Sequence, residues 1–170
     1  RVQKRVEPSD ADALTKLIVL CQQQNYAQAM ASLKALDVNL LKQDLAFQQI
    51  WLQVQLHNFN WVEVKKHLPK INKQVEKLTS SGENSVLVAW HQQLTEHFTQ
   101  SFDNFVRKNS VNQLLNVWQE LGKSVQHLAP VSRAYIQVLA EQNQLQQIEQ
   151  VLLQDEKLHG ELWLLNNLRI

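Results

Sequence analysis

The sequence predicts an all-α protein in which antiparallel helical hairpins stack as a right-handed solenoid of about eight helices. Three observations lead to this prediction. Apolar residues recur at helical spacing along nearly the whole chain. The 170 residues include only three Gly and three Pro, too few for the many tight turns of a β-barrel or β-sandwich. Breaks of a few residues separate the predicted helices, as between the helices of a hairpin.

The composition excludes several classes of protein. Hydrophobic residues make up 44% of the chain, which excludes overall disorder. The net charge of +1 offers no strong field to nucleic acid, so no nucleic-acid partner is expected. A single Cys excludes a disulfide framework and a Cys-rich metal module. No apolar run reaches membrane length, so no membrane span is expected in these residues.

The first hairpin is predicted over about residues 10–36. Ser9 is a candidate N-cap for its first helix, where apolar residues recur at i, i+3, i+4 and i+7 as far as Cys21. A polar break at residues 22–25 ends that helix. Asn25, the last residue of the break, can cap the second helix.

The second hairpin is predicted over about residues 42–78, with a break at residues 57–60 between its two helices. Pro69 falls inside the second of these helices. Proline removes a backbone hydrogen bond there and clashes with the preceding turn. The helix is therefore expected either to kink at Pro69 or to divide into two short helices.

The third hairpin is predicted over about residues 86–121, after an exposed loop at residues 79–85. Ser110 and Gln113 fit a capping box at the start of its second helix. Gly122 follows that helix at the position where a left-handed C-terminal cap is expected.

The fourth hairpin is predicted over about residues 130–155. Pro130 suits the first turn of a helix, and a polar break at residues 142–144 separates the two helices. The four hairpins are expected to form one domain over residues 1–170, with residues 161–170 as a tail.

An internal repeat relates these hairpins. In the second helix of each hairpin, a large apolar residue is followed three positions later by another apolar residue. A second large apolar residue comes four positions after that. The first members are spaced by about 35, 50 and 34 residues, against about 34 residues for a tetratricopeptide repeat. The alternative is a helical bundle without a repeat. The four series are Tyr26/Ala29/Leu33, Trp61/Val64/Leu68, Val111/Leu114/Trp118 and Leu145/Ile148/Leu152.

Several features together resemble the HemY-type tetratricopeptide proteins of proteobacterial inner membranes. The stretch from Trp61 to Pro69 reads Trp-Val-Glu-Val-Lys-Lys-His-Leu-Pro, and the family has this Trp and this Pro. A long helix, then Trp118, then Leu139-Ala140-Glu141 follow in a similar order, and the chain closes with a Leu-rich tail. The resemblance spans about residues 10–170.

The resemblance implies that the chain is the soluble middle portion of a protein anchored in the bacterial inner membrane. It does not say on which side of the membrane this portion lies. The family's two N-terminal transmembrane helices and further C-terminal repeats are not in these residues. Its association with haem and porphyrin metabolism implies protein partners among the enzymes of haem biosynthesis. It also implies an alternative function, haem or porphyrin binding as a carrier, although the residues themselves indicate no cofactor.

The repeat favours a non-enzymatic protein–protein interaction module, because a helical solenoid presents a concave groove lined by the first helix of each hairpin. Amide side chains there can both donate and accept hydrogen bonds to an extended peptide. The repeat register predicts a groove formed by Gln49, Gln53, His57, Asp103, Arg107, Arg133, Gln137 and Glu141.

A basic stripe is predicted on the helix that contains Pro69. Its lysines fall at i, i+4, i+7 and i+11 and would suit an acidic partner or phospholipid headgroups. The alternative is a solvated face opposite the apolar face of the helix. The stripe consists of Lys66, Lys70, Lys73 and Lys77.

No catalytic or metal-binding constellation stands out, so the chain is not expected to be an enzyme. The six His form no i, i+4 pair, and neither H-E-x-x-H nor C-x-x-C-H occurs. Cys21 lies on an apolar helix face and is expected in the core, as are the Trp residues other than Trp163. The Leu-rich tail at residues 161–170 is expected to pack back on the last two helices or to form a homodimer with a second copy.

Overall fold

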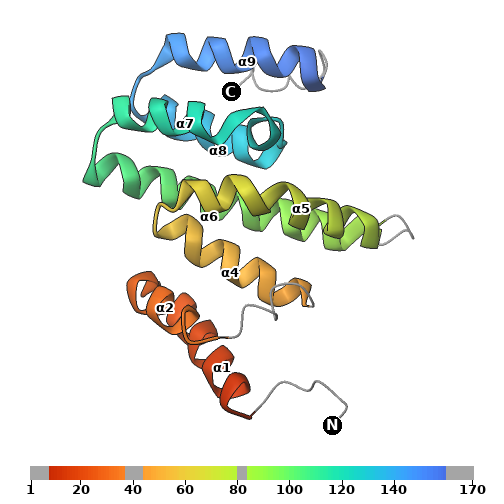
Figure 1. Ribbon diagram of the computed structural model, residues 1–170. Coiled ribbons are helices and arrows are strands. Elements are labelled where there is room, and N and C mark those ends of the chain that lie inside the picture. The colour runs from red at the N-terminus through yellow and green to blue at the C-terminus, as the bar shows by residue number, and fades with distance from the viewer. Residues whose placement is uncertain (1–7, 37–43, 80–83, 160–170) are drawn as a thin grey trace. The chain divides into compact units, whose positions relative to one another are not determined.

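The computed structural model describes residues 8–36, 44–79 and 84–159, and in these residues it is all-helical, without strands (Figure 1). None of the described helices is both long enough and apolar enough to cross a membrane. The described helices are α1 (Pro8–Gln22), α2 (Tyr26–Leu33), α4 (Leu45–His57), α5 (Trp61–Thr79), α6 (Asn84–Lys108), α7 (Val111–Gln126), α8 (Ala129–Glu141) and α9 (Leu145–His159).

The all-α fold class predicted from the sequence is confirmed, and the solenoid arrangement of its hairpins stays a prediction. The chain divides into two compact units, Arg1–Gln74 and Val75–Ile170. The division falls inside α5.

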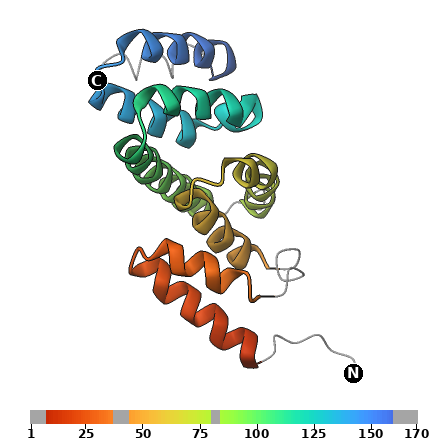
Figure 2. The same cartoon turned by 60° about the vertical axis from the view of Figure 1, so that its left-hand side comes forward.

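In the first unit, α1 and α2 form an antiparallel hairpin (Figure 2). Gln24 takes a positive φ of 58° in the break between them. Asn25 is the N-cap of α2, as predicted, because its side chain accepts a hydrogen bond from the Gln28 backbone N–H at 3.5 Å. Leu17 and Ala29 are fully buried within this unit.

The helix α4 follows and packs against α2. Its N-cap is Asp44, whose side chain accepts a hydrogen bond from the Ala46 backbone N–H at 3.0 Å. The helix therefore begins at Leu45, three residues later than the start predicted at residue 42. Residues 37–41 of the predicted first connection, and Lys42 and Gln43, lie outside the described residues.

The helix α5 runs from Trp61 to Thr79 with Pro69 inside it. The predicted alternative of two short helices is therefore wrong, because one continuous helix contains the proline. Val64 and Leu68 are fully buried and Ile71 nearly so. Burial of this apolar face offsets the hydrogen bond that Pro69 cannot make.

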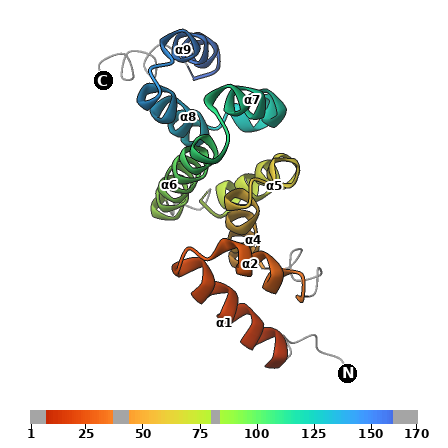
Figure 3. The same ribbon diagram turned by 90° about the vertical axis from the view of Figure 1, so that its left-hand side faces the viewer.

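In the second unit, α8 lies between α6 and α9, and α7 packs beside α6 and α8 (Figure 3). The core of this unit is aromatic. The rings of Trp118 and Tyr135 stack with centroids 3.9 Å apart, and the ring of Phe102 meets Tyr135 edge-on at 5.9 Å. Burial raises the pKa of the Tyr135 hydroxyl well above its usual range.

The observed ends of α7 and α8 agree in part with those predicted from the sequence. The Ser110 hydroxyl accepts from the Gln113 backbone N–H at 3.1 Å and donates to the Gln113 side-chain oxygen at 3.2 Å. Pro130 lies in the first turn of α8, as predicted. Gly122 has a positive φ of 72°, but its ψ of 174° is not that of a left-handed cap. The predicted break after residue 121 is confirmed by the non-helical backbone at Gly122, but a further short helical segment, which was not predicted, follows it and extends to Gln126.

Two further boundaries differ from the sequence prediction. Thr79 belongs to α5, and α6 begins at Asn84, so both helices extend into the predicted loop at residues 79–85. Only residues 80–83 of that loop lie outside the described residues, and so does the tail at residues 161–170. The predictions that this tail packs back or dimerises therefore stay predictions.

The predicted core residues are buried. Cys21 and four of the tryptophans, Trp51, Trp61, Trp90 and Trp118, are all less than 9% exposed. Burial also raises the pKa of the Cys21 thiol to about 11, so the thiol stays protonated at neutral pH. Trp163 lies outside the described residues.

Candidate functional site

A groove with a volume of about 700 Å³ lies between α6 and α8 in the second unit. One helical face of α6 forms one side of it, and α8 contributes an arginine and an amide. We call it the α6–α8 groove. Its lining residues are Val88, His91, Gln92, Thr95, Glu96, Thr99, Gln100, Arg133 and Gln137.

The amino-acid pattern of α6 explains why this face is polar. Trp90, Leu94 and Phe98 are buried on the core face, and the groove residues occupy the positions between them. Thr95 and Thr99 donate their hydroxyl hydrogens to backbone oxygens one turn earlier, at 2.9 and 2.6 Å. Their oxygens keep lone pairs that can accept hydrogen bonds in the groove.

Three side chains in the groove can carry a charge. Arg133 is exposed and forms no ion pair with any described residue. Glu96 is exposed on α6. Burial lowers the pKa of His91, with Glu76 opposing this effect and Arg133 reinforcing it. His91 is therefore mainly neutral at pH 7, so its imidazole can both donate and accept a hydrogen bond.

The structure places the predicted groove residues of the second unit in different surroundings. Arg133 and Gln137 both line the α6–α8 groove. Asp103 and Arg107 instead form an ion pair with each other at 2.9 Å, one turn apart on α6. These two residues and Glu141, which is exposed in the last turn of α8, are not among the described residues lining the groove.

Two of the three predicted groove residues of the first unit contact Tyr26 of α2. The ring of His57 stacks on the ring of Tyr26 with centroids 4.0 Å apart. Gln53 donates from Nε2 to the Tyr26 hydroxyl oxygen at 3.4 Å, and Gln49 is half-buried on α4. Gln53 and His57 therefore help to join α4 to α2.

Sequence reasoning missed most of the residues that α6 contributes to the groove. The repeat register assigned Asp103 and Arg107, in the second half of this 25-residue helix. The residues that face α8 lie in its first half, from Val88 to Gln100. The sequence does carry a signal for them, a row of polar residues at helical spacing between Trp90, Leu94 and Phe98.

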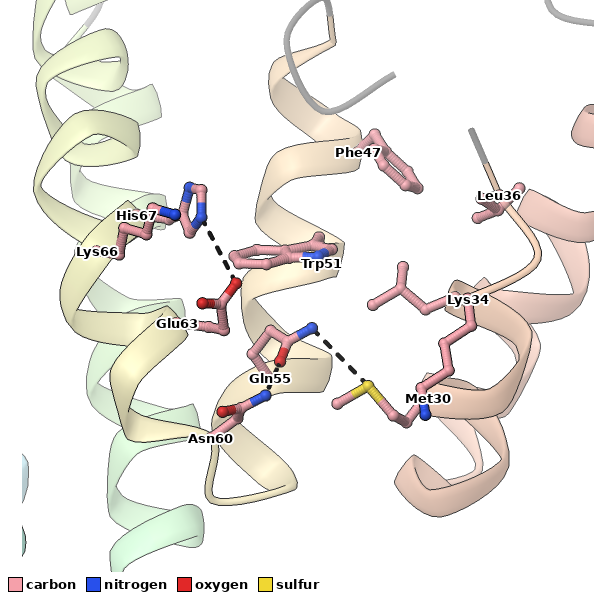
Figure 4. Close-up of a pocket in the computed structure, with 11 residues that line it drawn as sticks. Met30, Lys34, Leu36, Phe47, Trp51, Gln55, Asn60, Glu63, Lys66 and His67 are labelled. Carbon is pink, nitrogen blue, oxygen red and sulfur yellow. Dashed lines mark hydrogen bonds and ion pairs between the residues drawn. The ribbon is translucent and has the colours of Figure 1, made fainter. Parts of the chain in front are cut away.

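The first unit contains a second cavity, of about 520 Å³, formed by α2, α4 and α5 (Figure 4). Its inner wall is apolar and two lysines stand at its rim, so we call it the lysine-rimmed pocket. The lining residues are Met30, Leu33, Lys34, Leu36, Phe47, Trp51, Gln55, Asn60, Glu63, Lys66 and His67.

Each of these two cavities contains one histidine. His67 Nε2 lies 3.8 Å from a Glu63 carboxylate oxygen, and the rings of His67 and Trp51 meet edge-on at 4.5 Å. Burial lowers the pKa of His67; Glu63 opposes this, and Lys66 and Lys70 reinforce it. Among the described residues, no group of three or more His, Cys, Asp or Glu side chains is arranged to hold a metal ion.

Comparison with known proteins gives no relative from which a function could be transferred. No protein-family model matches the chain. No curated protein and no solved structure matches it either.

Proposed function

We propose that the chain is a non-enzymatic protein–protein interaction module, a helical scaffold that binds an extended peptide segment of a partner protein in the α6–α8 groove. One observation carries the proposal. The groove combines the guanidinium of Arg133, which forms no ion pair with a described residue, with hydrogen-bonding amides and hydroxyls from two packed helices.

The dimensions of the groove fit a short extended segment. The lining residues of α6 run from Val88 to Gln100, which corresponds to about 18 Å of helix at 1.5 Å per residue. An extended peptide covers that length with about five residues at 3.3 Å each. Gln92, Gln100 and Gln137 can pair with backbone groups of such a peptide, since each amide both donates and accepts.

Arg133 gives the groove a preference for an acidic group. A guanidinium binds a carboxylate through two parallel N–H···O bonds, and such charge-assisted bonds are stronger than neutral ones. Glu96 on the opposite helix would repel a second acidic group. The preferred segment is therefore mainly neutral and polar, with one acidic residue.

The wider setting of this module rests on the family resemblance. We propose that the chain is part of a HemY-like protein anchored in a bacterial inner membrane, and that its partners include enzymes of haem biosynthesis. The tetratricopeptide-like stacking of the helical hairpins belongs to the same proposal. The stacking is supported by the contacts between consecutive helices within each unit and by the packing of α6 against α8.

A matched pair of double variants tests the peptide-binding function. Arg133→Ala/Gln137→Ala removes a cation and an amide from the groove, and Gln119→Ala/Lys123→Ala removes the same two side-chain types from the exposed surface of α7. All four positions are exposed, so both variants should fold. Quantitative pull-down from membrane extracts should show partner recovery falling about tenfold for the groove variant alone. Equal recovery by the two variants would contradict the proposal.

The alternative function, haem or porphyrin binding, fits the described geometry less well. His67 lines the apolar lysine-rimmed pocket, but its Nε2 is directed to Glu63 and its ring contacts Trp51. In this arrangement it does not fit as an axial ligand. Titration with haemin distinguishes the two functions: the peptide-binding proposal predicts no saturable shift of the Soret band, and a saturable shift would favour the carrier.

A further inference from the structure

We propose that the first unit carries a second docking site, in which the lysine-rimmed pocket holds one apolar side chain of an acidic peptide segment. In the peptide, acidic residues would follow this apolar side chain and pair with Lys66, Lys70 and Lys73 on α5. This site shares no residue with the α6–α8 groove, so the inference does not rest on the function proposed above.

The inner wall of the pocket suits an apolar side chain. Leu33, Phe47 and Trp51 form this wall and are themselves almost completely buried, so a ligand would contact surfaces that the fold already holds in place. The volume of about 520 Å³ accommodates a large aliphatic or aromatic side chain together with neighbouring backbone. Pockets of this kind are mostly apolar with a few polar groups that fix orientation.

A chain of hydrogen bonds holds one end of the pocket in position. Asn60 donates from Nδ2 to Gln55 Oε1 at 2.7 Å, and Gln55 donates from Nε2 to the Met30 sulfur at 3.8 Å (Figure 4). These bonds connect the start of α5 to α4 and α4 to α2. The pocket is thereby preorganised, which reduces the entropy lost when a ligand binds.

The rim and the adjoining helix surface are basic. Lys34 follows α2 and Lys66 lies on α5; both are exposed and neither forms an ion pair with a described residue. Lys70 and Lys73 continue from Lys66 along the same exposed face of α5. The predicted basic stripe therefore begins at the pocket itself. Lys77, its fourth member, lies beyond the boundary of the first unit.

The spacing of these lysines sets the pattern of the ligand. From Lys66 to Lys73 the helix rises about 10 Å, which an extended peptide covers with about three residues. Acidic residues are therefore expected within the three or four positions after the apolar anchor.

One carboxylate in the pocket acts against an acidic ligand. Glu63 faces the pocket from α5, and its nearest basic partner, His67, is mainly neutral at pH 7 because burial lowers the His67 pKa. The three charged side chains of the pocket, Lys34, Lys66 and Glu63, still leave a net positive charge. The acidic residues would lie on the lysine side, away from Glu63.

Fluorescence anisotropy with three labelled synthetic peptides tests this inference on the intact chain. The first peptide carries one phenylalanine followed by four glutamates, the second has serine in place of phenylalanine, and the third has glutamine in place of each glutamate. We expect saturable binding of the first peptide and about tenfold or more weaker binding of each of the others. Binding of the first should also weaken as salt rises from about 50 to 200 mM.

Charge-reversal variants locate the site. Lys66→Glu/Lys70→Glu should abolish binding of the first peptide, and Lys108→Glu/Lys123→Glu, two exposed lysines of the second unit, should leave it unchanged. The Arg133→Ala/Gln137→Ala variant should also bind normally, which separates this site from the α6–α8 groove. The inference is overturned if no peptide binds, or if the serine peptide binds as tightly as the phenylalanine peptide. It is also overturned if vesicles of phosphatidylglycerol compete fully for the lysines, since the stripe would then be a lipid-binding surface.

Discussion

At Gly122 the backbone of α7 has φ 72° and ψ 174°, a region that a residue with a Cβ atom enters only under strain. The short helical segment after Gly122 is held to the preceding part of α7 by the buried Gln126, which donates from Nε2 to the Trp118 backbone oxygen at 2.6 Å. The chain therefore depends on a glycine at this one position to place Val125 and Gln126 in the core.

Replacing this glycine should destabilise the protein. Gly122→Ala is expected to lower the free energy of unfolding by about 1–3 kcal/mol, because alanine must adopt the same strained backbone. Urea denaturation followed by circular dichroism measures the change, with Lys123→Ala as the neighbouring control. A loss of under about 0.5 kcal/mol would mean that the backbone at this position can relax.

His97 on α6 gives the protein a dependence on pH. Burial lowers its pKa below the usual 6.5, with Glu96 opposing this effect. Just below pH 6.5 the unfolded chain binds a proton that the folded chain does not, so stability falls as the pH decreases through this window. His67 and His91 should also make the protein less stable as the pH decreases, because burial lowers their pKa values too.

Removing the titrating group should reduce this dependence. The free energy of unfolding of the unmodified chain should fall between pH 7 and pH 5, and His97→Gln should show a smaller fall, after allowing for any change at pH 7. Urea titrations at both pH values provide the comparison. An equal or steeper fall in the variant would show that His97 is not a source of the acid sensitivity.

At the scale of single helices, α5 tolerates Pro69 although the residue cannot donate a backbone hydrogen bond. Pro69→Ala should restore that bond and remove the steric clash, and we expect the free energy of unfolding to rise by about 1 kcal/mol or more. Thermal and urea unfolding measure the difference. Lys70→Ala, an exposed neighbour on the same helix, is the control. A destabilised alanine variant would show that the proline ring contributes more by packing than it costs the helix.

The helices and several of their ends could be predicted from the sequence because their causes are local. Asn25 and Ser110 accept hydrogen bonds from residues three positions later, and Pro130 enters its helix at a position that needs no N–H donor. The break at Gly122 shows the limit of such signals. A glycine after an apolar helix predicts the break that is present there, but it does not predict the further turn of helix that tertiary burial of Val125 and Gln126 holds beyond it.

The candidate site could be predicted only in part, because a groove depends on contacts between distant segments. The repeat register placed Arg133, Gln137 and Glu141 on one face of α8, and the first two of these line the α6–α8 groove. The α6 residues were missed because the register does not say which half of a 25-residue helix packs against α8. The lysine-rimmed pocket was missed because it forms only where α2, α4 and α5 meet. Lys66 of its rim had been identified as part of a basic stripe.

At the scale of the whole molecule, the two units offer surfaces of different chemistry. The second unit presents a polar groove with the exposed guanidinium of Arg133, and the first presents an apolar pocket beside a row of lysines. Such a pair suits a scaffold that recognises two segments of a partner, because linking two weak contacts raises the overall affinity. A variant that alters only the α6–α8 groove, or only the lysine-rimmed pocket, should therefore weaken partner capture.

Site-specific photocrosslinking in the native cells tests the central claim, that the α6–α8 groove binds a partner protein, most directly. The photoreactive residue p-benzoylphenylalanine would replace Gln92 inside the groove or, in the control, Lys123 on the exposed surface of α7. The account predicts an ultraviolet-dependent adduct of defined mass from position 92, absent from position 123 and lost when Arg133→Ala is added. No adduct from position 92, or the same adduct from both positions, would contradict it.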